Sequence, residues 1–301
     1  SHLNLHPQRG YEERKTSISP VRPFPSSVKC SQHKKKYKTE RSLNYYIFMT
    51  RTKEKIKKRS YSPFLINRKS IYGVLEIIFS ELKNSIYKSL DKESSKEKKV
   101  LNYVKEKAVK NDPESVLKII DDCGYNKFFL MNIGDHKGKI LDDYVLESKA
   151  QKALELGVYL GYSTIRIARN LSKSSHLYSI DANNDFLEIA KEHIEFSGLN
   201  DKVTFYNGKA SEVIPRLNEK FDFVFIDHWK EAYLTDLKLL IENNCLNDGA
   251  IIFADNIVLF HLEDYLEFVR TNPNFESKFI PTLREYSSSH PDGIEVSYFR
   301  K

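Results

Sequence analysis

The fold of this chain is decided by the stretch Phe221-Asp222-Phe223-Val224-Phe225-Ile226-Asp227-His228-Trp229-Lys230, an apolar run that closes in a polar cluster. A second run, residues 250–254, closes in Asp255 and Asn256. Short, nearly continuous apolar runs of this kind are typical of strands buried on both faces of a parallel sheet. Ligands of open α/β sheets bind beyond the carboxyl ends of such strands. The two runs therefore predict an α/β fold with a site for chemistry at that edge.

The same rhythm continues on both sides of these runs. Strands are predicted at residues 153–156, 176–180, 203–206, 221–226 and 250–254. Helices are predicted at residues 163–171, 185–197, 211–217, 232–241 and 262–270. This alternation indicates a mostly parallel sheet with helices on both faces. Residues 278–283 and 294–299 follow without a helix between them, which predicts an antiparallel hairpin at the sheet edge.

Helices are also predicted ahead of the first strand. Ser94 and Glu97 have the spacing of a capping box, which starts a helix in front of Val100. Asp112 followed by Pro113 is a typical start for a second helix. A glycine-punctuated loop is expected over residues 131–138, and a third helix over residues 140–150.

The charge of the chain is unevenly distributed. Residues 1–99 hold 24 Lys and Arg against 9 Asp and Glu, whereas residues 100–301 hold 24 against 32. Residues 1–93 are expected to form a basic, largely disordered extension with an amphipathic helix at residues 71–90. Residues 94–301 are expected to form the ordered domain. Since that domain is net acidic, no nucleic-acid partner is expected, and the tail has at most a weak attraction to anionic membrane surfaces.

The location of the protein is predicted from what its sequence contains. Three widely spaced cysteines, Cys30, Cys123 and Cys245, suit reduced thiols rather than a disulfide framework. No segment reaches the length of about 18–20 apolar residues that a membrane-spanning helix needs. No secretory signal is visible at the start of the sequence. These features predict a cytoplasmic protein without a transmembrane segment, and a monomer is expected.

A glycine turn follows the first predicted strand. Gly157 and Gly161 allow a tight turn and a close approach of the backbone to a ligand, although an ordinary strand-to-helix turn has the same composition. The second strand ends at Asp181, and an acid at this distance commonly accepts hydrogen bonds from ribose hydroxyls. Alternatively, Asp181 caps the next helix. Taken together, the glycines and the acid favour a cofactor that contains a nucleoside.

Hard oxygen atoms follow the two decisive strands. The carboxylates of Asp227 and Asp255 and the amide of Asn256 are ligands that Mg²⁺ prefers, and a bound metal would lower the pKa of a coordinated hydroxyl. Lys230 then stands where a general base is needed. The structural alternatives are loop or capping acids and a solvated lysine at the start of a helix.

Three further residues, Trp229, His228 and Glu295, have two readings each. Trp229 is either a core anchor or a flat wall for an adenine ring. His228 suits hydrogen bonding better than metal binding among hard oxygens. Glu295 is either a salt-bridging strand residue or an acceptor for a substrate hydroxyl.

The domain from about residue 98 to residue 299 resembles the catechol O-methyltransferase family, whose members depend on Mg²⁺ and use S-adenosylmethionine. The collinear matches are residues 131–138, 155–163, 227–230, 254–256 and 292–295. The resemblance implies a Rossmann-like class I methyltransferase fold with a seven-stranded sheet. It also implies methyl transfer to a hydroxyl of a catechol, including catecholamines.

The resemblance further assigns roles to individual residues. It implies that Asp227, Asp255 and Asn256 hold Mg²⁺, that Lys230 is the general base, and that Glu295 orients the second hydroxyl. The implied cofactor residues are Ile133, Gly157, Tyr159, Ser163, Asp181, Ala182, Ala210, Ser211, Asp227, His228 and Trp229. The implied substrate residues are Lys230, Asn256, Glu295, Phe129 and Met131.

This chain departs from the family pattern at the cofactor and substrate positions. Asp181 replaces a glutamate, and Ala210 with Ser211 replaces a Ser-Gln pair. Phe129 replaces a tryptophan at the substrate gate, and Phe260 replaces a proline opposite it. These departures concern cofactor and substrate contacts, whereas the implied metal ligands, the base and Glu295 match the family pattern. The alternative function is a catalytically idle fold that acts as a binding or trafficking partner.

Overall fold

The computed structural model describes residues 95–301. The predicted extension and its helix at residues 71–90 lie outside the described residues, as does Cys30. None of the helices between residues 95 and 301 combines the length and the apolar character that are needed to cross a membrane.

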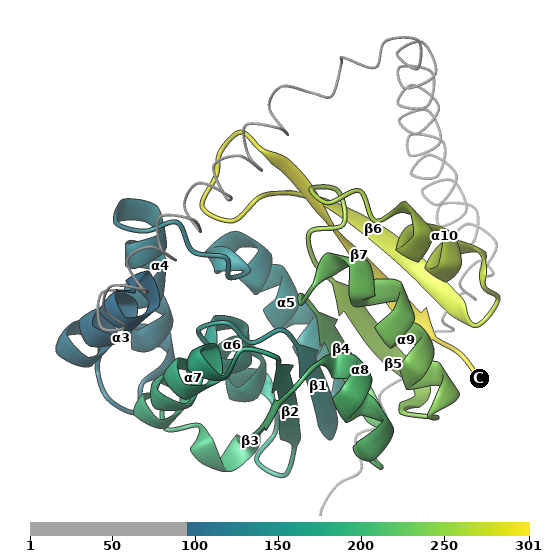
Figure 1. Ribbon diagram of the computed structural model, residues 1–301, viewed down its shortest axis with the longest axis horizontal. Coiled ribbons are helices and arrows are strands. Elements are labelled where there is room, and N and C mark those ends of the chain that lie inside the picture. The colour runs from purple at the N-terminus through teal and green to yellow at the C-terminus, as the bar shows by residue number, and fades with distance from the viewer. Residues whose placement is uncertain (1–94) are drawn as a thin grey trace, which may run out of the picture. The chain divides into compact units, whose positions relative to one another are not determined.

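A seven-stranded sheet forms the centre of the domain (Figure 1). Its order is β3-β2-β1-β4-β5-β7-β6, and β7 is antiparallel to both β5 and β6, whereas the other neighbours are parallel. The strands are β1 (Lys152–Leu156), β2 (His176–Asp181), β3 (Val203–Asn207), β4 (Phe221–Ile226), β5 (Leu246–Ala254), β6 (Phe275–Leu283) and β7 (Pro291–Phe299). The predicted parallel sheet with a C-terminal antiparallel hairpin is confirmed.

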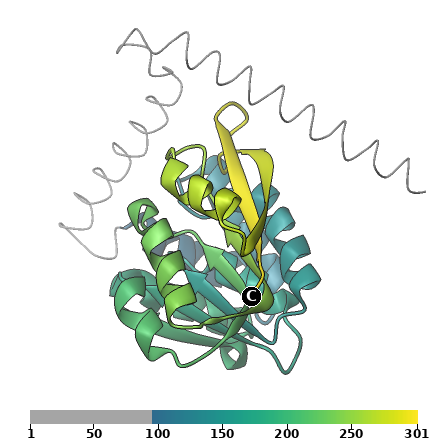
Figure 2. The same ribbon diagram turned by 90° about the vertical axis from the view of Figure 1, so that its right-hand side faces the viewer.

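Helices cover both faces of this sheet, as Figure 2 shows from the side. The helices on one face are α3 (Lys96–Lys107), α4 (Pro113–Asn126), α5 (Gly134–Ser148), α6 (Tyr162–Asn170) and α7 (Asn184–Phe196). Those on the other face are α8 (Ala210–Val213), α9 (Tyr233–Glu242) and α10 (Glu263–Thr271). Short 3₁₀ turns lie at Asn200–Lys202, Ile214–Arg216 and Lys230–Ala232.

Strand β4 is buried on both faces of the sheet. Its side chains point alternately to the two faces, so that Phe223 and Phe225 join the core under α5, while Val224 and Ile226 join the core under α9. All four side chains are fully buried. A central strand therefore needs apolar residues at successive positions, which is the pattern that decided the fold from the sequence.

Two predicted boundaries ahead of the first strand are wrong. Ser95, rather than Ser94, caps α3, because its side chain accepts a hydrogen bond from the Lys98 amide. Helix α5 begins at Gly134, within the predicted loop, where the Asn132 side chain accepts a bond from the Gly134 amide. Gly138 lies inside this helix, at a position that has no room for a side chain, because the Arg166 side chain occupies the place of a β-carbon.

Candidate active site

Backbone hydrogen bonds bring the carboxyl ends of β1, β4 and β5 to one edge. The Asp227 amide donates to the Leu156 carbonyl at 2.9 Å, and the Asp255 amide donates to the Ile226 carbonyl at 3.1 Å. The ladder thus continues one residue past each strand. The polar residues that follow β4 and β5 are therefore neighbours in space, as the sequence predicted.

The glycine turn after β1 is packed against the end of β4. Gly157 has a φ of 95°, and a β-carbon there would lie 2.5 Å from the Asp227 carbonyl oxygen. The Asp181 carboxylate holds the turn, accepting bonds from the amides of Val158 and Tyr159 at 2.9 and 3.1 Å. Its other oxygen accepts from the Asn183 amide at 2.8 Å.

Asp181 is not the cap of α7, because the side chain of Asn183 fills that position. Of about four lone-pair sites on a carboxylate, the three amides leave about one for a ribose hydroxyl.

A buried carboxyl group lies beneath this turn. Glu155 is fully buried and accepts bonds from the hydroxyls of Ser163, Thr164 and Ser179 at 2.5, 2.7 and 2.6 Å. Burial raises the pKa of Glu155 to about 7, although the three hydroxyl bonds act to lower it. The proposed cofactor residue Ser163 is therefore oriented by a carboxyl group that sequence reasoning noted only as part of the turn.

Lys230 lies against the first predicted metal ligand. Its Nζ donates to Asp227 Oδ1 at 2.6 Å and to the Tyr233 hydroxyl at 2.8 Å. The Tyr233 hydroxyl donates in turn to the Asp255 carbonyl at 3.2 Å. This chain of contacts ties the end of β4 to the end of β5 and makes Tyr233 a member of the site, which the sequence did not indicate.

Asp255 and Asn256 are tied to a second layer of charged residues. Lys137 is 1% exposed, and its Nζ contacts Asp255 Oδ2 at 2.7 Å, Asp292 Oδ2 at 2.9 Å and Glu285 Oε2 at 3.3 Å. Asn256 Nδ2 donates to Asp292 Oδ2 at 2.8 Å. Sequence reasoning gave no role to Lys137, Asp292 or Glu285, although the first two lie inside the strings that matched the family.

This cluster places three carboxyl groups around one lysine. Burial acts to lower the pKa of Lys137, but the three carboxylates hold it well above its usual value. Burial, together with the charges of Asp227 and Asp292, raises the pKa of Asp255 to about 8, in spite of Lys137. An additional cation at this edge would relieve the repulsion between the carboxylates.

The donor atoms fit a small divalent cation. Among the described residues, the buried Asp255 Oδ1 has no hydrogen-bond partner, while Oδ2 is held by Lys137. No group of three or more His, Cys, Asp and Glu side chains between residues 95 and 301 is arranged to hold a metal. The predicted set does not need one, since it consists of two carboxylates and one amide oxygen. Waters complete the coordination of Mg²⁺ in such sites.

His228 and Trp229 follow Asp227 but serve different purposes. His228 Nε2 shares a hydrogen bond of 2.7 Å with Asp236 Oδ2, and its ring stacks on Tyr233 at 5.2 Å. That bond is the hydrogen-bonding role that the sequence favoured. Trp229 is 73% exposed, so it is no core anchor and leaves a flat surface at the end of β4.

Glu295 lies on β7 beside the site, and its carboxylate is engaged. Its two oxygens accept from Nε and Nη2 of Arg270 at 2.6 and 2.7 Å, and Glu295 is fully buried. The salt-bridging reading therefore matches this structure. A contact to substrate stays a prediction.

The remaining predicted residues gather at the same edge. Ile133 is buried immediately before α5, and the Tyr159 hydroxyl donates to Glu97 at 3.0 Å. Ala182 follows β2 and is exposed, while Ala210 and Ser211 begin α8, with Ala210 buried and Ser211 exposed.

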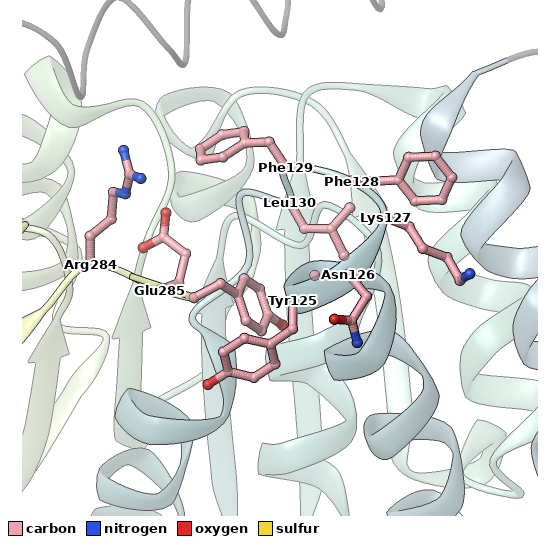
Figure 3. A pocket seen from close by; sticks show the side chains of 10 residues that line it. Tyr125, Asn126, Lys127, Phe128, Phe129, Leu130, Arg284 and Glu285 are labelled. Atoms are coloured by element: carbon pink, nitrogen blue, oxygen red, sulfur yellow. The ribbon is translucent and has the colours of Figure 1, made fainter. Parts of the chain in front are cut away.

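A cavity of about 320 Å³ adjoins the predicted substrate gate (Figure 3). It is lined by two segments, residues 124–130 and 284–286. Phe129 is partly buried there, with the Arg284 guanidinium 5.4 Å from the centre of its ring. Glu285 joins this cavity to Lys137. Met131 follows on the same loop and is partly buried.

A comparison with protein families shows which family this chain belongs to. The model of the O-methyltransferase family matches residues 93–263. The chain belongs to the O-methyltransferase family. The resemblance found in the sequence, and the prediction that the chain is an enzyme of this type, are confirmed.

Individual methyltransferases show how close the likeness is. A catechol O-methyltransferase from Bos taurus is 38% identical over 76% of this chain and 86% of its own length. Catechol O-methyltransferase B from Danio rerio is 40% identical over 68% of this chain and 80% of its own length. The crystal structure of an O-methyltransferase from Bacillus cereus has a TM-score of 0.54 and 24% identity, covering 67% of this chain and 97% of its own, and so supports the fold alone.

Proposed function

We propose that this methyltransferase transfers the methyl group of S-adenosylmethionine to a hydroxyl of a catechol in a Mg²⁺-dependent reaction. Two observations carry the proposal, in a chain similar to catechol O-methyltransferases. Lys230 donates a hydrogen bond to Asp227 after β4, and after the neighbouring strand β5 the buried Asp255 Oδ1 has no hydrogen-bond partner among the described residues.

Asp227, Asp255 and Asn256 would hold the metal. When bound, Mg²⁺ would supply a positive charge that acidifies a coordinated hydroxyl. The three residues follow the ends of two strands whose backbones are hydrogen-bonded to each other, so the backbone that carries them is held in place without a ligand. Methyl transfer benefits from such fixed geometry, because it depends on holding the attacking oxygen in line with the methyl group.

Lys230 would act as the general base. It lies within hydrogen-bond reach of Asp227, and the Tyr233 hydroxyl directs its Nζ toward the end of β5. In its neutral form Lys230 would receive the proton of the attacking hydroxyl. Glu295 would orient the second hydroxyl once one of its oxygens leaves Arg270.

The turn after β1 would bind the cofactor. Gly157 and Tyr159 would approach it with their backbone, Asp181 would accept a bond from the ribose, and Ser163 would line the same site. Ile133, His228 and Trp229 would provide further contacts, and Ala182, Ala210 and Ser211 would flank the adenine. Phe129, Met131 and Asn256 would contact the substrate.

A methyl-transfer assay with dopamine, with and without EDTA, tests the proposal. Product should form in Mg²⁺ and disappear in EDTA. Metal-independent transfer would contradict the mechanism, and undetectable binding of S-adenosylmethionine by calorimetry would instead support a binding role. Monomeric action in the cytoplasm stays a prediction from the sequence.

A further inference from the structure

We propose that Asp292 and Lys137 are positioning residues of the metal site, which fix the orientation of Asn256 and Asp255 before a cation binds. This inference rests on the proposed function, because it concerns the same three ligands.

Asp292 sets the direction of the Asn256 amide. It is 3% exposed, and its Oδ2 accepts from Asn256 Nδ2 at 2.8 Å. An ionised carboxylate accepts hydrogen bonds and cannot donate them. The amide must therefore turn its NH₂ group to Asp292, which keeps the amide oxygen out of that contact and leaves it available to a cation.

Lys137 does the same for Asp255. Its Nζ contacts Oδ2 at 2.7 Å, and Oδ1 of the same carboxylate has no hydrogen-bond partner among the residues described by the structure. Lys137 thus holds Oδ2 of Asp255, and Oδ1 is left available to a cation. The Lys137 contact to Asp292, at 2.9 Å, joins the two positioning residues into one unit.

The surrounding backbone holds this unit in place. Asn256 has a φ of 57°, a left-handed conformation that asparagine adopts more readily than most residues. The Leu259 amide donates to Asp292 Oδ1 at 3.3 Å, and the Ile257 amide donates to the Gly293 carbonyl at 3.1 Å. Side chains behind metal ligands typically affect metal affinity by about 10–100-fold when they are removed.

A matched pair of variants separates orientation from charge. Asp292→Ala and Glu285→Ala each remove one carboxylate that contacts Lys137, but only Asp292 bonds to Asn256. Binding of Mn²⁺ to the full chain is measured by the electron paramagnetic resonance signal of the free ion. Affinity for S-adenosylmethionine in EDTA and the thermal midpoint in EDTA report the integrity of the fold.

Asp292→Ala should bind Mn²⁺ at least about tenfold more weakly than Glu285→Ala, with cofactor affinity retained in both. Equal losses in the two variants would overturn the inference and leave only an effect of charge. If Asp292→Ala does not fold, Asp292→Glu, which keeps the charge but displaces the oxygens, should show the same loss, and wild-type affinity in that variant would also overturn the inference. Failure of the wild-type protein to bind Mn²⁺ would instead refute the proposed metal-dependent function.

Discussion

Glu155 makes the stability of this domain depend on pH. Its carboxyl group is fully buried, and burial raises its pKa from 4.5 to about 7. The folded protein therefore keeps a proton that the unfolded chain loses above pH 4.5. The free energy of unfolding should fall as the pH rises from 4.5 to about 7 and level off above that range. At about 1.4 kcal/mol for each pH unit, the fall amounts to about 3 kcal/mol.

Glu155→Gln removes the titrating group and keeps a side chain of the same size. Urea unfolding of the variant and of the wild type, measured between pH 5 and pH 8, gives the difference in free energy at each pH. Other titrating groups cancel in that difference, which should change by about 2–3 kcal/mol over the range, to the disadvantage of the wild type at high pH.

A difference that stays constant between pH 5 and pH 8 would refute the reasoning. It would mean that the hydroxyls of Ser163, Thr164 and Ser179 compensate the buried charge completely and that Glu155 is ionised throughout.

Three other changes give independent tests. Burial lowers the pKa of His193 to about 4, so the stability that its neutral form contributes is present above pH 6.5 and is lost as the pH falls toward 4. In His193→Gln, the free energy of unfolding should therefore fall by about 3 kcal/mol less than in the wild type between pH 6.5 and pH 4. The same pH dependence in the variant and the wild type would contradict this expectation. Gly157→Ala should destabilise the domain by more than about 2 kcal/mol, because the new β-carbon would clash with the backbone of Asp227. Gly161→Ala should lower the thermal midpoint less, because its β-carbon would lie 3.1 Å from that of Ala190. A larger loss of stability in Gly161→Ala than in Gly157→Ala would contradict the packing of this turn. Lys230→Ala should lower the turnover number by at least about a hundredfold while cofactor affinity measured by calorimetry is retained, and normal turnover would exclude Lys230 as the base.

Features that depend on neighbouring residues in the sequence could be predicted. Phe223 to Ile226 are apolar at successive positions, so the central strand and the place of Asp227 at its end follow from the pattern alone. Asp255 and Asn256 follow from the next strand in the same way. The start of α5 could not be predicted, because Gly134 and Gly138 are residues typical of a loop. Their place in a helix depends on contacts with the side chains of Asn132 and Arg166, which the sequence pattern does not show.

The second layer of the site could not be predicted for a different reason. Lys137 is 118 residues from Asp255 and 155 residues from Asp292 along the chain. A lysine within a helix is usually solvated, and only the packing of α5 against the ends of β5 and β7 buries this one. The pairing of Glu295 with Arg270 likewise depends on where α10 crosses the sheet.

The measurement that tests the central claim most directly is transfer of a labelled methyl group from S-adenosylmethionine to a catechol, compared with a phenol that lacks the second hydroxyl. The full chain in Mg²⁺ should label the catechol and not the phenol; EDTA should abolish the reaction, and excess Mg²⁺ should restore it. Equal labelling of the catechol in Mg²⁺ and in EDTA would contradict a reaction that depends on a cation held by Asp227, Asp255 and Asn256.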